Sequence, residues 1–133
     1  MPRPPDILIS LSSFGAAEVR RHGQRWFARL AAEAGADGVE VRGELLAGGL
    51  AGDDTELDEI TETARGLGLQ LVYSSPQGLW ADDGVLDEAA LARGLAAARR
   101  LGAPRLKMSI GGYRADAAAG LLPRLRNALE GQP

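Results

Sequence analysis

Residues 35–46 read GADGVEVRGELL, and they join a helical pattern to a strand pattern. The preceding stretch WFARLAAEA, residues 26–34, repeats apolar side chains at three- and four-residue spacing, which is typical of an amphipathic helix. In the following GVEVR, small or apolar residues alternate with charged ones, which is the period of a β-strand. We therefore predict a helix followed directly by a strand that carries Glu40 and Arg42 on one of its two faces.

This helix-to-strand junction recurs along the chain. The stretches GLGLQLVYS and RLGAPRLKMS resemble EAGADGVEV, and their junction glycines, Gly35, Gly68 and Gly102, are 33 and 34 residues apart. Glycine is favoured just past a helix end because it adopts the left-handed conformation without strain. Together with the opening DILISLSS, the pattern predicts four similar units, each with a strand and a helix.

The predicted strands and helices alternate, which is typical of a parallel sheet. The strands are expected at 7–12, 38–42, 69–74 and 105–110. The helices are expected to end at about Ala34, and to span 56–67, 86–101 and roughly 121–129. Apolar stripes mark the predicted buried sides of the first and last helices: Trp26, Phe27, Leu30, Ala31 and Ala34 in the first, and Leu122, Leu125 and Leu129 in the last.

The two faces of the predicted strands differ in polarity. One set of alternate positions is apolar and suits a face covered by helices: Ile7, Ile9, Leu11, Val39, Val41, Leu71, Tyr73, Leu106, Met108 and Ile110. The other set becomes polar toward the strand ends, as in a barrel whose active site lies at the C-terminal face. We predict an α/β fold: a (βα)4 half of a TIM (βα)8 barrel, with parallel strands and outer helices, in one half domain over residues 1–133.

Composition narrows the classes of partner. The chain has 133 residues, a formal net charge of −3, no cysteine and a single histidine, His22. The charge balance gives no basic surface for nucleic acid or anionic membrane, and cysteine and multi-histidine metal sites are excluded. No apolar run approaches the roughly 18 residues of a membrane span. We expect a cytoplasmic protein with no nucleic-acid or membrane partner.

Four stretches together resemble a known family. AGADGVEVR, DILISLSS, LVYSSP and LKMSIGG, in this order and spacing, look like the first half of a xylose isomerase-like TIM barrel, a superfamily that includes sugar phosphate isomerases and epimerases. The resemblance covers about residues 7–129. It implies metal-assisted proton transfer on a small sugar or sugar phosphate.

The resemblance also implies what is missing. The family's divalent metal, Mn, Mg, Co or Zn, is held mostly by residues of strands five to eight, so we expect this chain to hold no metal alone, to supply no catalytic residue and to be inactive by itself. Glu40 matches the glutamate of the family's G-x-x-V-E pattern, which borders the substrate site. Ser74, Lys107 and Ser109 match by strand position only.

The candidate substrate-binding residues each have a structural alternative. They are Ser12, Glu40, Arg42, Ser74, Trp80, Lys107 and Ser109. Glu40 and Arg42 could bind a polyol, or form an ion pair with Lys107 as a further partner. The serines could bind sugar hydroxyls or turn the chain. Trp80 could stack on a sugar or anchor its loop.

Other polar features have simpler explanations. Gly111–Gly112 could expose N–H groups to an anion, but a flexible loop is favoured. The carboxylates of 53–54 and 82–87 are interpreted as helix caps rather than metal ligands. His22 is interpreted as a surface imidazole.

Two alternatives to an isomerase half remain. The chain could be a non-catalytic (βα)4 module that forms a homodimeric barrel through its half-barrel edges. It could instead be a lyase similar to class I 3-dehydroquinate dehydratases, with Lys107 as the Schiff-base lysine, although LVYSSP departs from that family's third strand.

Overall fold

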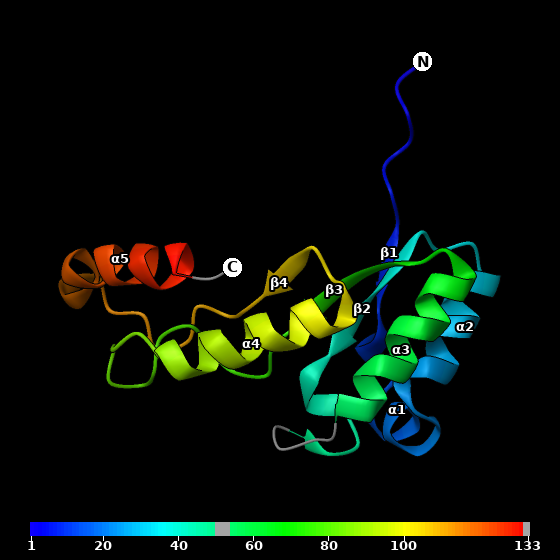
Figure 1. The fold of residues 1–133 in the computed structure, drawn as a ribbon, viewed down its shortest axis with the longest axis horizontal. Coiled ribbons are helices and arrows are strands. Elements are labelled where there is room, and N and C mark those ends of the chain that lie inside the picture. The colour runs from blue at the N-terminus through cyan, green and yellow to red at the C-terminus, as the bar shows by residue number, and fades with distance from the viewer. Residues whose placement is uncertain (50–53, 132–133) are drawn as a thin grey trace.

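The computed structural model describes residues 1–49 and 54–131, and it contains a four-stranded sheet of parallel strands (Figure 1). The strands are β1 (Leu8–Ser10), β2 (Gly38–Arg42), β3 (Gln70–Ser74) and β4 (Arg105–Lys107), in the spatial order β1-β2-β3-β4. Consecutive strands are therefore neighbours, without the reversal of order that defines a doubly wound sheet. The α/β class and the parallel sheet are confirmed, and the order is consistent with half of a barrel.

The helices follow the predicted alternation with changed bounds. They are α1 (Ala16–His22), α2 (Gln24–Glu33), α3 (Asp54–Leu67), α4 (Glu88–Leu101) and α5 (Ala115–Glu130), with short 3-10 turns η1 (Leu11–Phe14) and η2 (Gly43–Leu45). The prediction of one continuous first helix is wrong, because Gly23, with φ 85°, separates α1 from α2. None of the helices within 1–49 and 54–131 has the length and apolarity that crossing a membrane requires.

The three junction glycines adopt the predicted conformation. Gly35, Gly68 and Gly102 have φ of 90°, 69° and 65°. At the end of α4 the N–H of Gly102 donates to the carbonyls of Ala98 and Arg99. These caps end each helix just before the next strand, which explains why the strands line up in one sheet.

The hydrophobic core lies between the sheet and helices α2, α3 and α4. Val39 and Val41 of β2 are fully buried, and Leu71 and Tyr73 of β3 are each 6% exposed. The prediction that these alternate positions face helices is confirmed for the two central strands. Near the edge strands it is confirmed for Leu11, which is fully buried, and for Ile9 and Leu106, which pack against the core. It is wrong for Ile7 and Ile110, which are 62% and 60% exposed because no helix in the described part of the chain covers them.

The outer strands are shorter than predicted. After Ser10 the chain turns into η1 instead of continuing to residue 12, and β4 ends at Lys107 instead of residue 110. An edge strand has one neighbour, so backbone pairing stops where that neighbour turns away. Ser12 and Ser109 therefore lie beyond the strands on which they were predicted.

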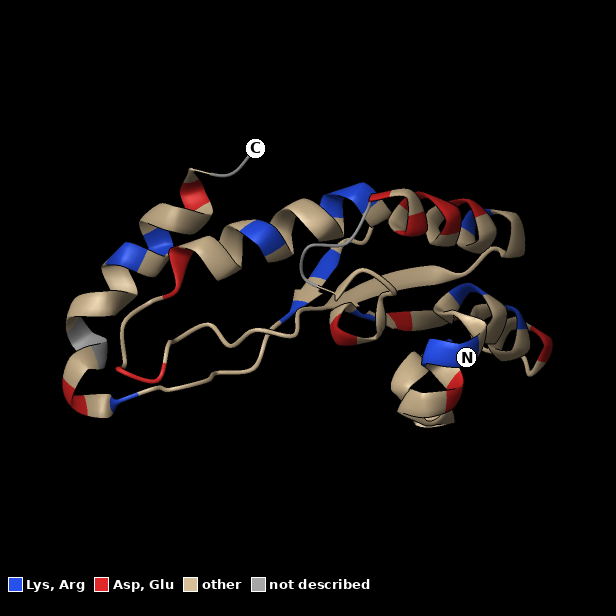
Figure 2. Cartoon of the chain, turned by 90° about the horizontal axis from the view of Figure 1, so that it is seen from below, with Lys and Arg blue, Asp and Glu red and all other residues tan. Residues whose placement is uncertain are grey.

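Three positions predicted to be buried are on the surface. Trp26 is 43% exposed on α2, where the buried side consists of Gln24, Phe27, Ala28 and Ala31 instead. Leu122 and Leu129 of α5 are 53% and 46% exposed. Helix α5 lies beside the N-terminal end of α4 and extends beyond it, rather than over β4, as Figure 1 and Figure 2 both show.

The loops after β3 and β4 extend the sheet beyond its strands. The N–H groups of Leu79 and Trp80 donate to the carbonyls of Ser109 and Ile110, at 2.9 and 3.2 Å. A side chain on Gly112 would collide with the carbonyl of Ala81. The glycine pair therefore permits close contact of two loop backbones, which differs from the flexible loop that the sequence favoured.

Candidate functional site

The candidate site lies on the face of the sheet opposite the helices, which we call the polar face. Parallel register aligns Ser10 with Glu40, and Glu40 with Val72. It also aligns Arg42 with Ser74, and Ser74 with Lys107. Because aligned residues of neighbouring strands point to the same face, the register gathers the polar residues toward the C-terminal ends of the strands.

Glu40 is the centre of this group. Its Oε1 accepts a hydrogen bond from Arg42 Nη1 at 2.8 Å, and Ser10 Oγ lies 3.4 Å from the same oxygen. The ammonium of Lys107 lies 3.3 Å from Oε2. The Glu40 side chain is 14% exposed, so this carboxylate is partly removed from water and satisfied by cationic and hydroxyl groups.

Arg42 bridges two carboxylates. Besides Glu40, its Nε and Nη2 both lie 2.8 Å from Glu44 Oε1. The other oxygen, Glu44 Oε2, is buried and has no hydrogen-bond partner among the described residues. Glu44, just beyond the strand in η2, is therefore held by an ion pair rather than standing free in solvent.

Gln24 binds the backbone at the C-terminal end of β2, a role that was not predicted from the sequence. Its side chain is fully buried, its Nε2 donates to the carbonyl of Arg42 at 2.8 Å, and its Oε1 accepts from the Arg42 N–H at 2.7 Å. Residue 24 lies in the stretch RRHGQR, which reads as surface. The signal that could have found it is helical spacing, since positions 24, 27, 28 and 31 share one side of α2.

The electrostatics keep Glu40 ionised. Burial alone raises its pKa, but hydrogen bonds from Arg42 and Lys107 outweigh burial, so the pKa lies below its usual value. Burial likewise opposes the charge of Arg42, while Glu44 and Glu40 favour it, and the pKa of Arg42 is raised. The cluster is therefore a charge-balanced set of hydrogen-bonding groups near neutral pH.

A shallow hollow of about 320 Å³ opens beside this cluster. It is lined by Arg42, Glu44, Ser74, Ser75, Pro76, Lys107, Met108 and Ser109. Arg42, Ser74, Lys107 and Ser109 of the predicted set thus share one depression. Ser12 lies outside it, and its hydroxyl is 2.9 Å from that of Ser10.

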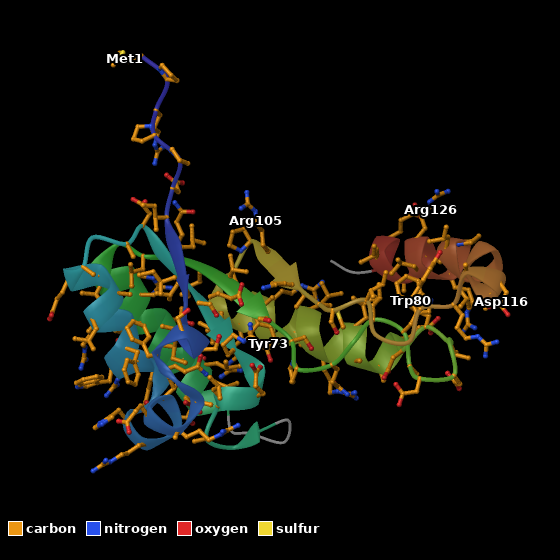
Figure 3. All side chains as sticks on the ribbon, turned by 180° about the vertical axis from the view of Figure 1, so that it is seen from behind. Met1, Tyr73, Trp80, Arg105, Asp116 and Arg126 are labelled. Atoms are coloured by element: carbon orange, nitrogen blue, oxygen red, sulfur yellow. The ribbon has the colours of Figure 1, made fainter. Side chains whose placement is uncertain are left out.

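Trp80 is not brought to this hollow. Its side chain is 6% exposed, its ring packs edge-on against Tyr113, and it lies near α5, away from Tyr73 (Figure 3). A buried indole has no free face for a sugar, so this placement fits the loop-anchoring role that the sequence left open. Its Nε1 has no hydrogen-bond partner in the described part of the chain.

The remaining polar candidates have structural roles. Asp87 caps α4, since its Oδ1 accepts from the Ala90 N–H at 2.9 Å. Asp54 begins α3, and Asp53 lies outside the described residues. His22 is exposed, as predicted, and stacks on Trp26 with ring centroids 4.9 Å apart.

The site's residues do not fit a metal ion by themselves. Within residues 1–49 and 54–131, no three or more His, Cys, Asp or Glu side chains gather closely enough to hold one. The two carboxylates of the site, Glu40 and Glu44, are separated by the guanidinium of Arg42. A cation between them would have to displace Arg42, so the two carboxylates serve as partners of Arg42 rather than as metal ligands.

No family model matches the chain, and no curated protein is significantly similar to it.

Proposed function

We propose that the polar face binds a small sugar or sugar-like hydroxycarbonyl compound, as one wall of an isomerase or epimerase site in a xylose isomerase-like TIM barrel. The observation that carries the proposal is the Glu40 carboxylate, held ionised by Arg42 and Lys107 on the face of the sheet opposite the described helices. Carboxylates and guanidinium groups placed beside an open hollow are suited to bind vicinal hydroxyls.

The chemistry of this wall is binding and orientation. Glu40 would accept hydrogen bonds from ligand hydroxyls, and Lys107, whose side chain is 61% exposed, would donate to a carbonyl or hydroxyl oxygen. Because Arg42 and Lys107 are already paired with Glu40 and Glu44, the cluster carries no surplus positive charge. This balance favours an uncharged polyol or ketose over its phosphate.

The wall alone supplies only part of a catalytic site. Proton transfer next to a carbonyl needs a base and an electrophile in a water-excluded space. The hollow is open on the side opposite the sheet, and the family's metal would have to be held by residues beyond this wall. We therefore propose weak binding by this chain's residues, with turnover only where residues other than this chain's own hold the metal.

The lyase alternative draws no support from Lys107. A Schiff-base lysine requires a desolvated amine, whereas this side chain is 61% exposed and lies 3.3 Å from Glu40 Oε2.

The test is titration of the ¹⁵N-labelled chain with D-fructose and, separately, with fructose 6-phosphate. We expect amide shifts at Glu40, Arg42 and Ser74 with a dissociation constant in the millimolar range, about −4 kcal/mol of binding free energy. Glu40→Gln should abolish the shifts, whereas Glu59→Gln, an exposed carboxylate on α3, should not change them. Absence of shifts at the polar face with either ligand would contradict the proposal.

A further inference from the structure

The chain exposes more surface than a folded protein of its mass usually does. Its accessible surface is 7913 Å² for a mass of 13.9 kDa. A monomeric protein of that mass exposes about 6,700 Å², so the excess is about 1,200 Å². The extended residues 1–6, all exposed, account for part of this excess, and the exposed apolar side chains near the sheet edges and on α5 account for another part.

Large apolar side chains are exposed at both ends of the sheet. Ile7 precedes β1 and is 62% exposed, whereas Ile110 and Tyr113 follow β4 and are 60% and 45% exposed. β1 and β4 are the edge strands. Unpaired strand edges with apolar neighbours are templates for pairing with another chain.

Helix α5 adds a third exposed apolar surface. It is joined to the rest of the chain by the Trp80–Tyr113 ring contact and by Arg124 Nη2, 3.3 Å from Glu88 Oε1. Leu122 and Leu129 on this helix remain about half exposed. In a βα unit the helix covers its own strand and the next strand of the sheet, and β4 has no next strand within this sheet.

We propose that a second copy of this chain supplies that strand, so that two copies close into an eight-stranded barrel. The β4 edge of each copy pairs in parallel with the β1 edge of the other. The exposed side chains of Leu122 and Leu129 on α5, and of Ile110 in the loop after β4, then supply apolar surface for contact with the other copy.

Symmetry favours a second copy over an unrelated partner. A two-fold axis brings the β1 and β4 edges together twice and leaves no edge open. Eight parallel strands is also the number at which side chains just fill the interior of a barrel. Two identical open four-stranded sheets therefore meet both requirements.

The charges permit this closure. Within the cluster on the polar face Glu40 and Glu44 balance Arg42 and Lys107, so two facing copies of the cluster add no net charge, and Arg105, which register aligns with Val72, adds one positive charge to each copy near the start of β4. At the sheet's other end β4 starts with Arg105, which points outward (Figure 3), and Asp6 precedes β1. When β4 of one copy pairs with β1 of the other, Arg105 and Asp6 lie at the same end of the paired strands with opposite charges.

The first experiment is light scattering coupled to size-exclusion chromatography across a dilution series. We expect twice the chain mass of 13.9 kDa. A monomer at every concentration, or a continuous series of larger species, would overturn the closed dimer. The readout needs no ligand, so it is independent of the sugar-binding test.

Variants of α5 test its role in the interface. The double substitution Leu122→Glu with Leu129→Glu should weaken the dimer by at least about a hundredfold, since it places charges against buried apolar surface. Leu67→Glu on α3 is the matched control, because Leu67 is similarly exposed, at 42%, and lies away from both edges. A dimer that withstands the α5 variant, with circular dichroism unchanged, would exclude α5 from the interface.

Cross-linking tests which sheet edges meet. Because the chain has no native cysteine, only the introduced cysteines can react. A mixture of Ile7→Cys and Arg105→Cys chains, treated with a short bismaleimide, should give a mixed cross-linked dimer. Ile7→Cys mixed with Trp26→Cys, an exposed site on α2, should give none. Equal cross-linking in both mixtures, or none in the first, would contradict the pairing of β1 with β4.

Discussion

The carboxylate of Glu40 on β2 lies 3.3 Å from the ammonium nitrogen of Lys107 on β4, which is 67 residues later and two strands away. Two strand spacings amount to about 9.5 Å, and register places Lys107 level with Arg42 rather than with Glu40. The two side chains must therefore lean toward each other. They can do so because the strand between them carries only short side chains on that face, Val72 and Ser74. The contact ties three strands together on the polar face.

The first prediction concerns the pH dependence of stability. Because the folded-state pKa of Glu40 is lowered, its stabilising contribution is present above the ordinary value of 4.5 and is lost as pH falls through the lowered value. Glu40→Gln should cost roughly 1–2 kcal/mol at pH 7, between exposed and buried ion pairs. Urea unfolding from pH 7 to pH 3 should show the two proteins converging at acid pH.

The control for that prediction is Glu59→Gln. This carboxylate is half exposed and 3.7 Å from Arg25, so its loss should change stability by less than about 0.5 kcal/mol. A constant difference between Glu40→Gln and the native chain at all pH values would contradict the ionised role of Glu40.

The second prediction concerns the buried amide of Gln24. Gln24→Leu keeps the volume but leaves the backbone N–H and carbonyl of Arg42 without their side-chain partner, so we expect a loss of about 2–4 kcal/mol. Gln70→Leu is the matched substitution at an exposed site whose side chain bonds only to Asp6 in the contacts described, and it should cost under about 1 kcal/mol. Equal losses in chemical denaturation would count against the positioning role of Gln24.

The third prediction separates two glycines by what surrounds them. Gly112→Ala would push a methyl group into the carbonyl of Ala81 and should destabilise the fold by about 1–3 kcal/mol. Gly66→Ala lies in helix α3, where an added Cβ meets nothing within 4 Å, and should stabilise by about 0.5–1 kcal/mol. Thermal unfolding of both variants checks the opposite signs.

The fourth prediction concerns the ion pair between helices α3 and α4. Arg100 donates to both carboxylate oxygens of Asp58, at 2.7 and 2.8 Å, and the pair is about half exposed. A double-mutant cycle with Asp58→Asn and Arg100→Gln should give a small favourable coupling that shrinks in 1 M salt. A coupling independent of salt would show that the pair is held by packing rather than by charge.

Local pattern determined much of what the structure shows. The glycines at 35, 68 and 102 fixed where helices end, and the two-residue alternation of GVEVR fixed which side of β2 carries Glu40 and Arg42. These features depend on residues near one another in the chain, so periodicity and backbone preference suffice to predict them. The parallel sheet follows from the same alternation of strands and helices.

Tertiary structure alone decided the rest. The burial of Gln24 depends on a strand end 18 residues away, the loop position of Trp80 depends on a crossing with the β4 loop, and the pairing of Glu40 with Lys107 depends on strand register. The exposure of Ile7 and of the α5 leucines depends on neighbours that this single chain does not place there. Burial is a property of the whole packed assembly, so a local apolar pattern can show that a side chain is suited to burial but not what covers it.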